Sequence, residues 1–486
     1  MSTQARGSVN MGLVGAIVAV ATIGGLLFGY DSGAVNGTQN GLKAAFALSE
    51  GGLGFTVGSL LIGCFIGAFF AGTLAESIGR RNVMRIASVL FLAGALIQGF
   101  APSQIIFVIS RMAGGMAVGA ASVLSPAYIS EVAPADIRGR LTTVQQIMII
   151  AGLTASALVN YFLQQAAGND STAVLGFGLA AWRWMFLAQA VPAAVFLIAL
   201  FFVPESPRFL VARGRDEEAR KVLASIFGEA SAPAKLNEIR ASFSSDHRPR
   251  LTDVVARGTL LRPIVWAGLI IAVFQQLVGI NVIFYYSATL WQAAGFSESQ
   301  ALLTTIINNS ISLVACFVTV GLVDKVGRKP LLLIGSVGMA ITLFAMAYAF
   351  STGALEGSTL HLPGSMGQVA VYSALAYSAL FNISWGPVMW VMLGEMFPNQ
   401  IRGSSLAVAG FAQWFANYLI VQSFPLMLAG IGLPASYSFY AICAVISFFL
   451  VARFIRETKG KELEEMEGWE LPSSAGDAEV ATVELH

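Results

Sequence analysis

The sequence predicts an all-α polytopic membrane protein in which twelve transmembrane helices form two six-helix halves. Of the 486 residues, 56% are hydrophobic and only 11% are charged, whereas a soluble domain carries about 25% charged residues. The few charges gather in short stretches. The apolar segments between them are long enough to cross the roughly 30 Å hydrocarbon layer as helices. Motifs of the first half also recur in the second half.

Hydropathy divides the chain into twelve apolar spans, with a polar stretch after the sixth. We expect an N-terminal half over 1–203, a linker over 204–260, a C-terminal half over 261–455 and a tail over 456–486. The linker is expected to form amphipathic helices, because its ARGRDEEARKVLASIF segment has apolar residues at helical spacing. The expected spans are 11–35, 52–75, 83–101, 104–132, 142–166, 181–203, 263–289, 300–323, 331–351, 366–393, 404–429 and 434–455.

Basic residues in the short loops set the expected orientation. The loops of one side hold almost nothing basic except Lys43, whereas the loops of the other side, with the linker, hold most of the Lys and Arg. Because Lys-rich and Arg-rich loops stay on the cytoplasmic side of a membrane, the linker and both termini are expected to be cytoplasmic. The chain has no basic tract with interleaved aromatic residues, so no nucleic-acid partner is expected.

Three pairs of motifs show that the two halves are tandem repeats. In each pair the second copy follows the first by roughly 250–265 residues. Parallel halves of this kind, with a site between them near the middle of the membrane, are a known plan of secondary transporters. The pairs are GTLAESIGRR at 72–81 and GLVDKVGRK at 321–329, Glu131 with Arg138-Gly139 and Glu395 with Arg402-Gly403, and PESPR at 204–208 and ETKG at 457–460.

These motifs, in this order, resemble the signatures of the sugar porter family of the major facilitator superfamily, and the resemblance covers nearly the full length. Within that family the chain is most similar to bacterial proton-coupled xylose and hexose symporters. The resemblance implies a major facilitator fold and proton-coupled symport of a monosaccharide, xylose or a hexose such as glucose, by alternating access. It also implies a multi-pass protein of the cytoplasmic (inner) membrane. We expect a monomer with a small-molecule sugar and the lipid bilayer as partners, and with the proton as coupling ion and no cofactor.

The charged residues of the repeated motifs are expected to form a cytoplasmic gate. Each motif places an acid at a helix end near arginines of a loop, so ion pairs between the halves would hold the inner side shut while the outer side is open. The alternative is that these charges only set topology and anchor loops at lipid headgroups. Their repetition in both halves favours the gate, although Glu76 stands where the family usually has Asp. The gate set is Glu76, Arg80, Arg81, Glu131, Arg138, Glu205, Arg208, Asp324, Arg328, Glu395, Arg402 and Glu457.

Only two spans carry a charged residue well away from their ends, Asp31 in the first and Arg111 in the fourth. A charge at the centre of a membrane helix costs about 2.5–3.5 kcal/mol on insertion scales. Counted from the expected outer ends of their spans, the two residues lie at similar depth, which predicts an ion pair. A carboxylate beside an arginine is held ionised, and it binds a proton more readily when it loses that arginine in a desolvated site.

We therefore expect Asp31 to carry the coupled proton and Arg111 to control it, and the alternative is a static structural pair. The resemblance supports the first reading, because proton symporters of the family have Asp at this position and facilitative glucose carriers have Asn. No span contains a histidine or a second acid that could replace Asp31.

Amides and aromatic rings inside the spans are the candidate sugar-binding groups. The seventh span carries three carboxamides within seven residues, and Gly279 can loosen the helix so that they face one cavity. Gly386-Pro387 is expected to break the tenth span. A neutral polyol needs groups that donate and accept hydrogen bonds and aromatic faces for its C–H surfaces. By resemblance the contacting residues are Gln146, Gln275, Gln276, Asn281, Trp390 and Gln413, with Phe28, Tyr285 and Trp414 lining the cavity and Asn417 one turn after Gln413.

The same residues distinguish a sugar symporter from other classes of protein. A facilitative sugar uniporter is the nearest alternative, and Asp31 argues against it. A sugar receptor, which is a different class of protein, usually needs a long cytoplasmic extension, and a drug exporter would not need an amide-rich cavity. No enzyme is expected, because the sequence has no metal-ligand cluster, nucleophile–base pair or phosphate-binding glycine loop. The exact sugar stays open, because Ser312 stands where the family commonly has Asn, and Asn308 and Asn309 lie about one turn earlier.

Overall fold

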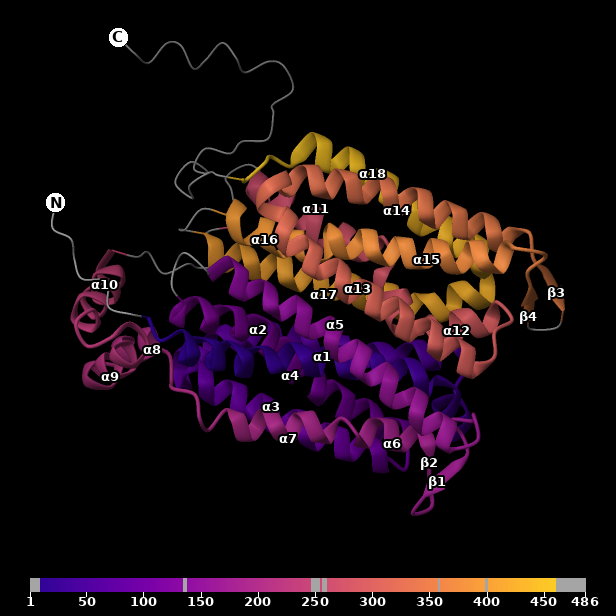
Figure 1. Ribbon diagram of the computed structural model, residues 1–486, viewed down its shortest axis with the longest axis horizontal. Coiled ribbons are helices and arrows are strands. Elements are labelled where there is room, and N and C mark those ends of the chain that lie inside the picture. Colours follow the sequence, from indigo (N-terminus) through magenta and orange to yellow (C-terminus); the bar gives the residue numbers. More distant parts are fainter. Residues whose placement is uncertain are drawn as a thin grey trace, which may run out of the picture.

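The computed structural model describes residues 9–133, 138–245, 254–255, 260–356, 359–397 and 401–459. Long helices run side by side in one bundle, with α1–α7 below and α11–α18 above in the view of Figure 1. The short helices α8–α10 lie at one end of the bundle, which we call the linker end. Two small hairpins, β1–β2 and β3–β4, lie at the opposite end, which we call the hairpin end (Figure 1).

The helices have the following bounds. The first six-span part contains α1 (Met11–Phe46), α2 (Glu50–Ile78), α3 (Arg80–Phe100), α4 (Gln104–Val132), α5 (Arg138–Ala166), α6 (Ala181–Leu187) and α7 (Ala190–Ala199). The short helices are α8 (Pro207–Ala212), α9 (Asp216–Phe227) and α10 (Ala232–Ser245). The second part contains α11 (Pro263–Leu277), α12 (Ile280–Ala293), α13 (Glu298–Val326), α14 (Arg328–Ser351), α15 (Met366–Ile383), α16 (Trp385–Met396), α17 (Arg402–Gly430) and α18 (Gly432–Phe454).

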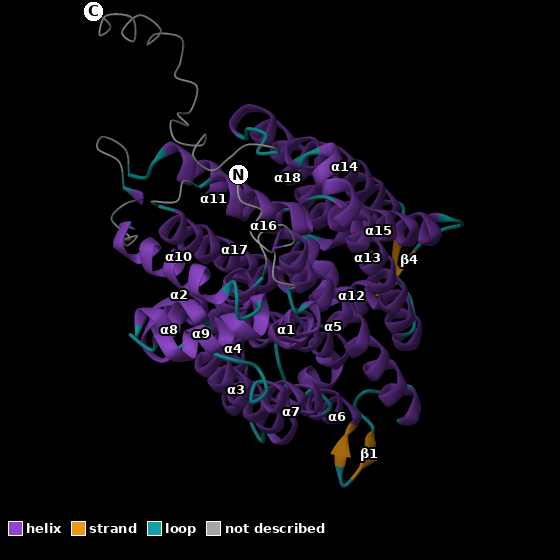
Figure 2. Cartoon of the chain, turned by 60° about the vertical axis from the view of Figure 1, so that its left-hand side comes forward, coloured by secondary structure: helices purple, strands orange, loops and turns teal. Residues whose placement is uncertain are grey.

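The strands are short and make two antiparallel hairpins. They pair β1 (Val174–Gly176) with β2 (Leu179–Ala180), and β3 (Ala354–Glu356) with β4 (Thr359–His361). Figure 2, with the linker end turned forward, shows that the rest of the described chain is helix and connecting loop.

Each of the twelve expected spans is present as one helix or as two consecutive helices. Among the described residues, eleven stretches are long and apolar enough to cross a membrane. The remaining expected span, 366–393, is interrupted at Ser384 and forms α15 and α16. The break lies at Ser384, two residues before the Gly386-Pro387 pair at which the sequence predicts it. Pro387 thereby sits in the first turn of α16, where a missing N–H is tolerated because those groups have no partner within the helix.

Helix α1 is longer than the sequence predicts. The expected span ended at residue 35, but α1 continues to Phe46. Its last part is polar, which is why hydropathy placed the end too early. In the structure Asn36 and Gln39 are buried, Asn40 is half-buried, and all three are hydrogen-bonded to α12. Contacts with another helix therefore stabilise this extension. Asp31 therefore lies near the middle of α1, farther from the end of the helix than the expected span of 11–35 placed it.

Close packing of α1 against α5 fixes the part of α1 that carries Asp31. A Cβ atom added at Gly29 would lie 1.8 Å from the carbonyl oxygen of Ile149, so only glycine fits at this contact. The neighbouring residues of α1 are thereby held deep in the bundle, where Asp31 is buried.

The linker helices have a small hydrophobic core of their own. Leu210 of α8, Leu223 of α9 and Leu236 of α10 are all buried in it. Helix α8 lies against α4 and α9 against α1, and the Asn10 N–H donates to the Ile226 carbonyl oxygen at 2.8 Å. The three helices are therefore attached to the first half of the bundle at its linker end.

Candidate functional site

The two charged residues predicted to pair inside the bundle do so. Arg111 Nη2 lies 3.2 Å from Asp31 Oδ2, and Nη1 lies 3.5 Å from Oδ1. Their side chains are 0% and 1% exposed. Arg111 also reaches the carbonyl oxygen of Val57 on α2, at 3.4 Å. A buried ion pair of this kind is weak evidence for stability, because removing two charges from water costs about as much as their attraction returns.

One turn of α1 carries three side chains that contact three different helices. Asp31 pairs with α4. Ser32 Oγ donates to Tyr285 Oη on α12 at 3.0 Å, and the Phe28 ring meets the Trp414 ring of α17 edge-on, with 5.3 Å between centroids. Residues three and four apart share one face of a helix. The charged pair is thus adjacent to two contacts with the second half of the bundle.

Four amide side chains from the predicted sugar-binding set form one hydrogen-bonded network. Asn281 Nδ2 donates to Gln276 Oε1, and Gln276 Nε2 donates to Gln275 Oε1 at 2.8 Å. Gln413 Nε2 of α17 donates to the same Gln275 oxygen at 3.2 Å. All four are buried. Residues that are far apart in the sequence therefore meet at one polar site inside the bundle.

Two interrupted helices bring this network together. Gly279 has a φ of 86°, a left-handed conformation that other residues rarely adopt, and it separates α11 from α12. The interruption brings Asn281 onto Gln276, five positions away and off the usual helical spacing. On the other side, the break before α16 leaves the carbonyl oxygen of Gly386 3.4 Å from Gln275 Nε2.

We expect Gly279→Ala to lower the melting temperature of the purified protein, with a cost of about 1–3 kcal/mol for the strained backbone. The added Cβ would also lie 2.7 Å from the Tyr440 ring. Gly410→Ala is the matched control, because no heavy atom lies within 4 Å of a Cβ placed there. Thermal unfolding followed by tryptophan fluorescence compares the variants. Equal melting temperatures for both would contradict the assignment of the break to Gly279.

Several buried polar atoms around the network have no hydrogen-bond partner in the described chain. They include Gln413 Oε1 and Asn417 Oδ1 on α17, and Ser312 Oγ and both amide atoms of Asn308 on α13. A buried polar atom without a partner costs free energy, so such atoms mark positions where a polar ligand or water binds. Asn308 and Ser312 are equally buried, and the structure leaves both as possible contacts in the eighth span.

The other predicted wall residues are placed differently. Tyr285 and Trp414 are buried and Phe28 is half-buried, all where the two halves meet. Trp390 on α16 is 39% exposed, and Gln146 on α5 is half-buried. Among the described residues, neither Trp390 nor Gln146 forms a hydrogen bond with the amide network.

Sequence reasoning missed a set of polar contacts that join α1 to α12 at the hairpin end. They involve three polar residues of α1 at helical spacing, which is the signal that could have revealed them. They close the bundle between its two halves at this end. The hydrogen bonds are Gln39 Nε2 to Tyr285 O at 2.5 Å, Asn40 Nδ2 to Gln292 Oε1 at 3.0 Å, Ala288 N to Asn36 Oδ1 at 2.9 Å, and Thr289 Oγ1 to Gln39 Oε1.

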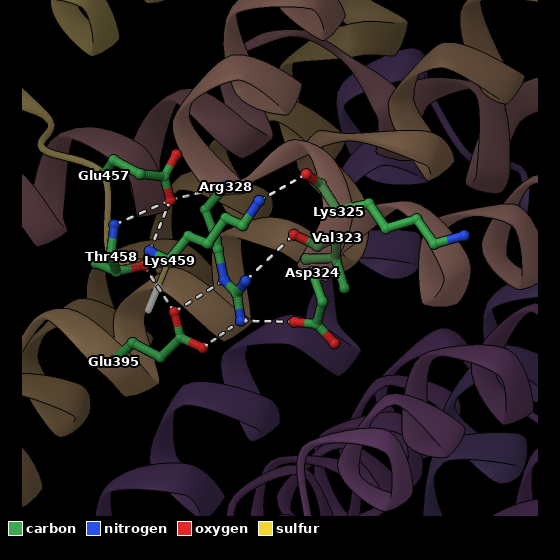
Figure 3. Close-up of polar contacts among 8 residues, drawn as sticks. All are labelled: Val323, Asp324, Lys325, Arg328, Glu395, Glu457, Thr458 and Lys459. Carbon is green, nitrogen blue, oxygen red and sulfur yellow. Dashed lines mark hydrogen bonds and ion pairs between the residues drawn. The ribbon is translucent and has the colours of Figure 1, made fainter. Parts of the chain in front are cut away.

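At the linker end, the predicted gate residues pair within each half. Arg80 Nη2 lies 3.1 Å from Glu131 Oε1 in the first half. In the second, Arg328 Nη2 lies 2.7 Å from Glu395 Oε1 and 3.1 Å from Asp324 Oδ1 (Figure 3). In each half a hydroxyl group also donates a hydrogen bond to the glutamate of the ion pair. Ser206 Oγ donates to Glu131, and Thr458 Oγ1 donates to Glu395 at 2.6 Å. The repeated motifs thus make the same arrangement twice.

A second acid in each copy binds the start of a helix. Glu205 Oε1 accepts from the Arg81 N–H at 3.2 Å, at the start of α3. Glu457 accepts from the Arg328 N–H group at 3.0 Å (Figure 3) and from the Lys329 N–H group at 2.9 Å, at the start of α14. A carboxylate is favourable there, because a helix N-terminus is partly positive. Burial raises the pKa of Glu457, but hydrogen bonds from four backbone N–H groups outweigh it and lower that pKa below its ordinary value.

The sequence predicted gate ion pairs between the two halves. The gate ion pairs named above lie within the halves in this conformation instead. Glu76 is exposed, and it makes no ion pair with another described residue. The side chains of Arg138 and Arg402 lie outside the described residues. The structure is therefore closed by hydrogen bonds between halves at the hairpin end, while these linker-end pairs stay inside their own halves.

Comparison with known proteins confirms the resemblance. The family described as "Sugar (and other) transporter" matches residues 17–469. The chain is 43% identical to the glucose transport protein of Synechocystis sp. over 96% of this chain and 99% of that protein. It is 40% identical to the D-xylose-proton symporter of Escherichia coli K12 over 99% of this chain and 100% of that protein.

Solved structures agree with the fold. An inward-open structure of the xylose transporter XylE from E. coli matches with a TM-score of 0.80 at 39% identity, covering 94% of this chain and 100% of that one. A partially occluded inward-open structure of the same transporter matches with a TM-score of 0.78. The twelve-helix major facilitator fold predicted from the sequence is thereby confirmed. The chain belongs to the sugar (and other) transporter family of the major facilitator superfamily, and it is a transporter rather than an enzyme.

Proposed function

We propose that this protein carries a neutral monosaccharide, xylose or a hexose such as glucose, together with a proton, by alternating access. The observation that carries the proposal is the Phe28–Ser32 turn of α1. This turn links the buried Asp31–Arg111 pair to aromatic residues of the second half. The identity of 40% to a D-xylose-proton symporter and of 43% to a glucose transport protein supports it.

The amide network suits a neutral polyol. Each carboxamide can donate and accept, as sugar hydroxyls do. In this structure Gln275, Gln276, Asn281 and Gln413 satisfy one another, and sugar hydroxyls could replace those bonds without leaving a buried polar atom unpaired. The unpartnered Gln413 Oε1 and Asn417 Oδ1 offer two further acceptors nearby.

The contacts of α1 give sugar movement a route to the proton site. Opening the hairpin end requires α12 to separate from α1, which breaks the bond from Ser32 to Tyr285. Asp31 lies next to Ser32, so a shift of this turn alters its contact with Arg111. Asp31 then gains or loses its proton according to whether the arginine holds it ionised. The sugar and the proton are thereby coupled through one turn of helix.

The basic loops support an orientation in which the linker end and both termini face the cytoplasm of an inner-membrane protein. The described conformation is then closed toward the outside, and the protein works as a monomer of two six-helix halves. When the hairpin end opens, the two halves approach at the linker end. There the acids and arginines of the repeated motifs pair across the halves and act as the inner gate.

Exchange of labelled sugar in liposomes tests the proposal. Purified protein should exchange labelled xylose or a hexose, and an excess of the unlabelled sugar should inhibit this exchange. Protein-free liposomes and liposomes loaded with an amino acid are the controls. Transport of a cation or a drug with no sugar exchange would overturn the proposal.

Gln276→Ala is expected to weaken sugar binding roughly 5- to 150-fold, because losing an amide that binds a buried hydroxyl costs about 1–3 kcal/mol. Trp390→Ala should also weaken binding, by removing an aromatic surface. Gln165→Ala is a matched control, since Gln165 is an exposed glutamine at the hairpin end. In the described part of the chain, its side chain bonds Tyr161 alone. Isothermal calorimetry measures the affinities. If neither Gln276→Ala nor Trp390→Ala changes the affinity, the sugar binds elsewhere.

A further inference from the structure

A cavity of about 490 Å³ lies at the linker end, away from the amide network. Its walls come from the junction of α2 and α3, from the segment before α8, and from α8 and α9. Pockets that hold small molecules typically measure about 300–1,000 Å³. The cavity shares Arg81 and Glu205 with the gate set, and no residue of the sugar-binding set lines it.

Cationic side chains outnumber carboxylates in this lining. Arg81, Arg213, Arg215 and Lys221 face Glu205 and Glu218, which leaves an excess of two positive charges. Only one of these cations is neutralised by a short ion pair in the described chain. Arg215 donates to both oxygens of Glu218, at 2.7 and 2.6 Å.

Lys221 and Arg81 have N–H groups that bind no other described residue. Lys221 is exposed on α9, and within the described residues it makes no hydrogen bond or ion pair. Arg81 Nη1 donates to the Val203 carbonyl oxygen at 3.2 Å, while its buried Nε has no partner in the described chain. An anion entering the cavity would therefore find donors that the protein itself leaves unused.

Apolar side chains complete the walls. Ile78, Leu210 and Val222 line the cavity, and the Arg213 guanidinium lies 5.7 Å from the centre of the Phe209 ring. The cavity thus offers basic groups beside apolar ones, which suits an anionic head attached to a carbon skeleton.

We propose that this cavity binds a phosphate-bearing anion, either the headgroup of an anionic phospholipid or a soluble phosphate ester. Guanidinium groups bind phosphate through pairs of parallel N–H bonds. Basic pockets between membrane helices are known to hold anionic lipid headgroups. The excess of two positive charges in the lining matches a phosphate monoester, which carries about −1.5 to −2 at neutral pH, and it exceeds the single negative charge of a phosphodiester headgroup.

Occupation of the cavity would fix the linker helices to the α2–α3 junction. Arg213 Nη2 already donates to the carbonyl oxygens of Ser77 and Glu76 at the end of α2, at 2.5 and 3.1 Å. Glu205 holds the first turn of α3 through the Arg81 N–H. A ligand that binds only when these elements are together stabilises their assembly by mass action. A rise in thermal stability is therefore the expected sign of binding.

The test measures the melting temperature of the full-length protein in neutral detergent by tryptophan fluorescence. One arm titrates phosphatidylglycerol against phosphatidylcholine. The other titrates inorganic phosphate against chloride at constant ionic strength. We expect a saturable rise with phosphatidylglycerol, with phosphate, or with both. Lys221→Gln should weaken the apparent affinity about fivefold, the equivalent of about 1 kcal/mol per basic residue, and Lys221→Gln with Arg213→Gln should weaken it about 25-fold.

Lys235→Gln is the control, because Lys235 lies on α10 outside the cavity and pairs with Glu238 at 2.7 Å. It should leave the affinity unchanged. A rise with phosphatidylglycerol alone identifies a lipid site, and a rise with phosphate identifies a site for soluble esters. The proposal is overturned if neither anion raises the melting temperature of the wild type, or if Lys235→Gln weakens the response as much as Lys221→Gln. Neither result depends on sugar transport.

Discussion

In Asp31→Asn we expect sugar accumulation driven by a pH gradient to disappear, while sugar binding and sugar exchange persist. Asparagine keeps the size and much of the hydrogen bonding of the side chain but cannot take up and release a proton. A sugar then crosses without its proton, so the gradient can no longer drive it uphill. Exchange needs no net proton movement and should continue.

The measurement compares uptake from an acidic exterior with counterflow, in proteoliposomes of wild type and variant. Asp170→Asn is the control, because Asp170 is an exposed acid at the hairpin end. Among the described residues, its carboxylate accepts hydrogen bonds from Thr172 alone. This control should accumulate sugar as the wild type does. Uphill accumulation by Asp31→Asn would show that another group carries the proton.

In Arg111→Gln we expect a loss of stability of about 3–5 kcal/mol, because removing one partner of a buried ion pair leaves the other charge unpaired. Asp31 would offset part of this cost by staying protonated, which stalls the transport cycle. The double variant Asp31→Asn/Arg111→Gln should recover most of the lost stability, since it leaves no buried charge at the pair.

A double-mutant cycle on chemical unfolding checks this expectation. The expected recovery places the coupling of the pair at the upper end of the range of about 0.5–3 kcal/mol that contacting residues show. If the losses of the two single variants simply add in the double variant, the pair is not energetically coupled. Proton-driven uptake should be absent in Arg111→Gln as well.

The features that the sequence predicted well are those with strong local signals. Asp31 and Arg111 stand out because a charge inside an apolar span is costly and therefore rare. The carboxamides around Gly279 stand out for the same reason, and the glycine itself indicates where the helix can break. Tandem repetition of short motifs indicated the two halves without any knowledge of their packing.

The features that the sequence did not reveal depend on partners far along the chain. The end of α1 is polar, and its burial follows from bonds of Asn36, Gln39 and Asn40 to α12, about 250 residues later. Hydropathy measures only local composition, so it ended the span early. The break of the tenth span was predicted at Gly386-Pro387, whereas the structure interrupts the helix at Ser384. The ring of Pro387 would clash with the carbonyl group four residues earlier in a continuous helix, so the break lies upstream of the proline.

Ion pairing of the gate residues could not be predicted for a different reason. The proposed alternating access implies two conformations, and a protein with two conformations encodes two sets of contacts in one sequence. Pairing of Arg80 with Glu131 and of Arg328 with Glu395 inside each half belongs to the conformation described here. The sequence names the participants, but only a structure of each state tells which pairs form in it.

Uptake of labelled sugar by wild-type proteoliposomes under an imposed pH gradient, with no sugar gradient at the start, tests the central claim most directly. The coupling assigned to Asp31 and Arg111 predicts that the vesicles concentrate sugar above the external level when the exterior is acidic, and that a protonophore abolishes this accumulation. If the vesicles exchange sugar but never concentrate it, the protein is a uniporter, and the Asp31–Arg111 pair serves only the structure.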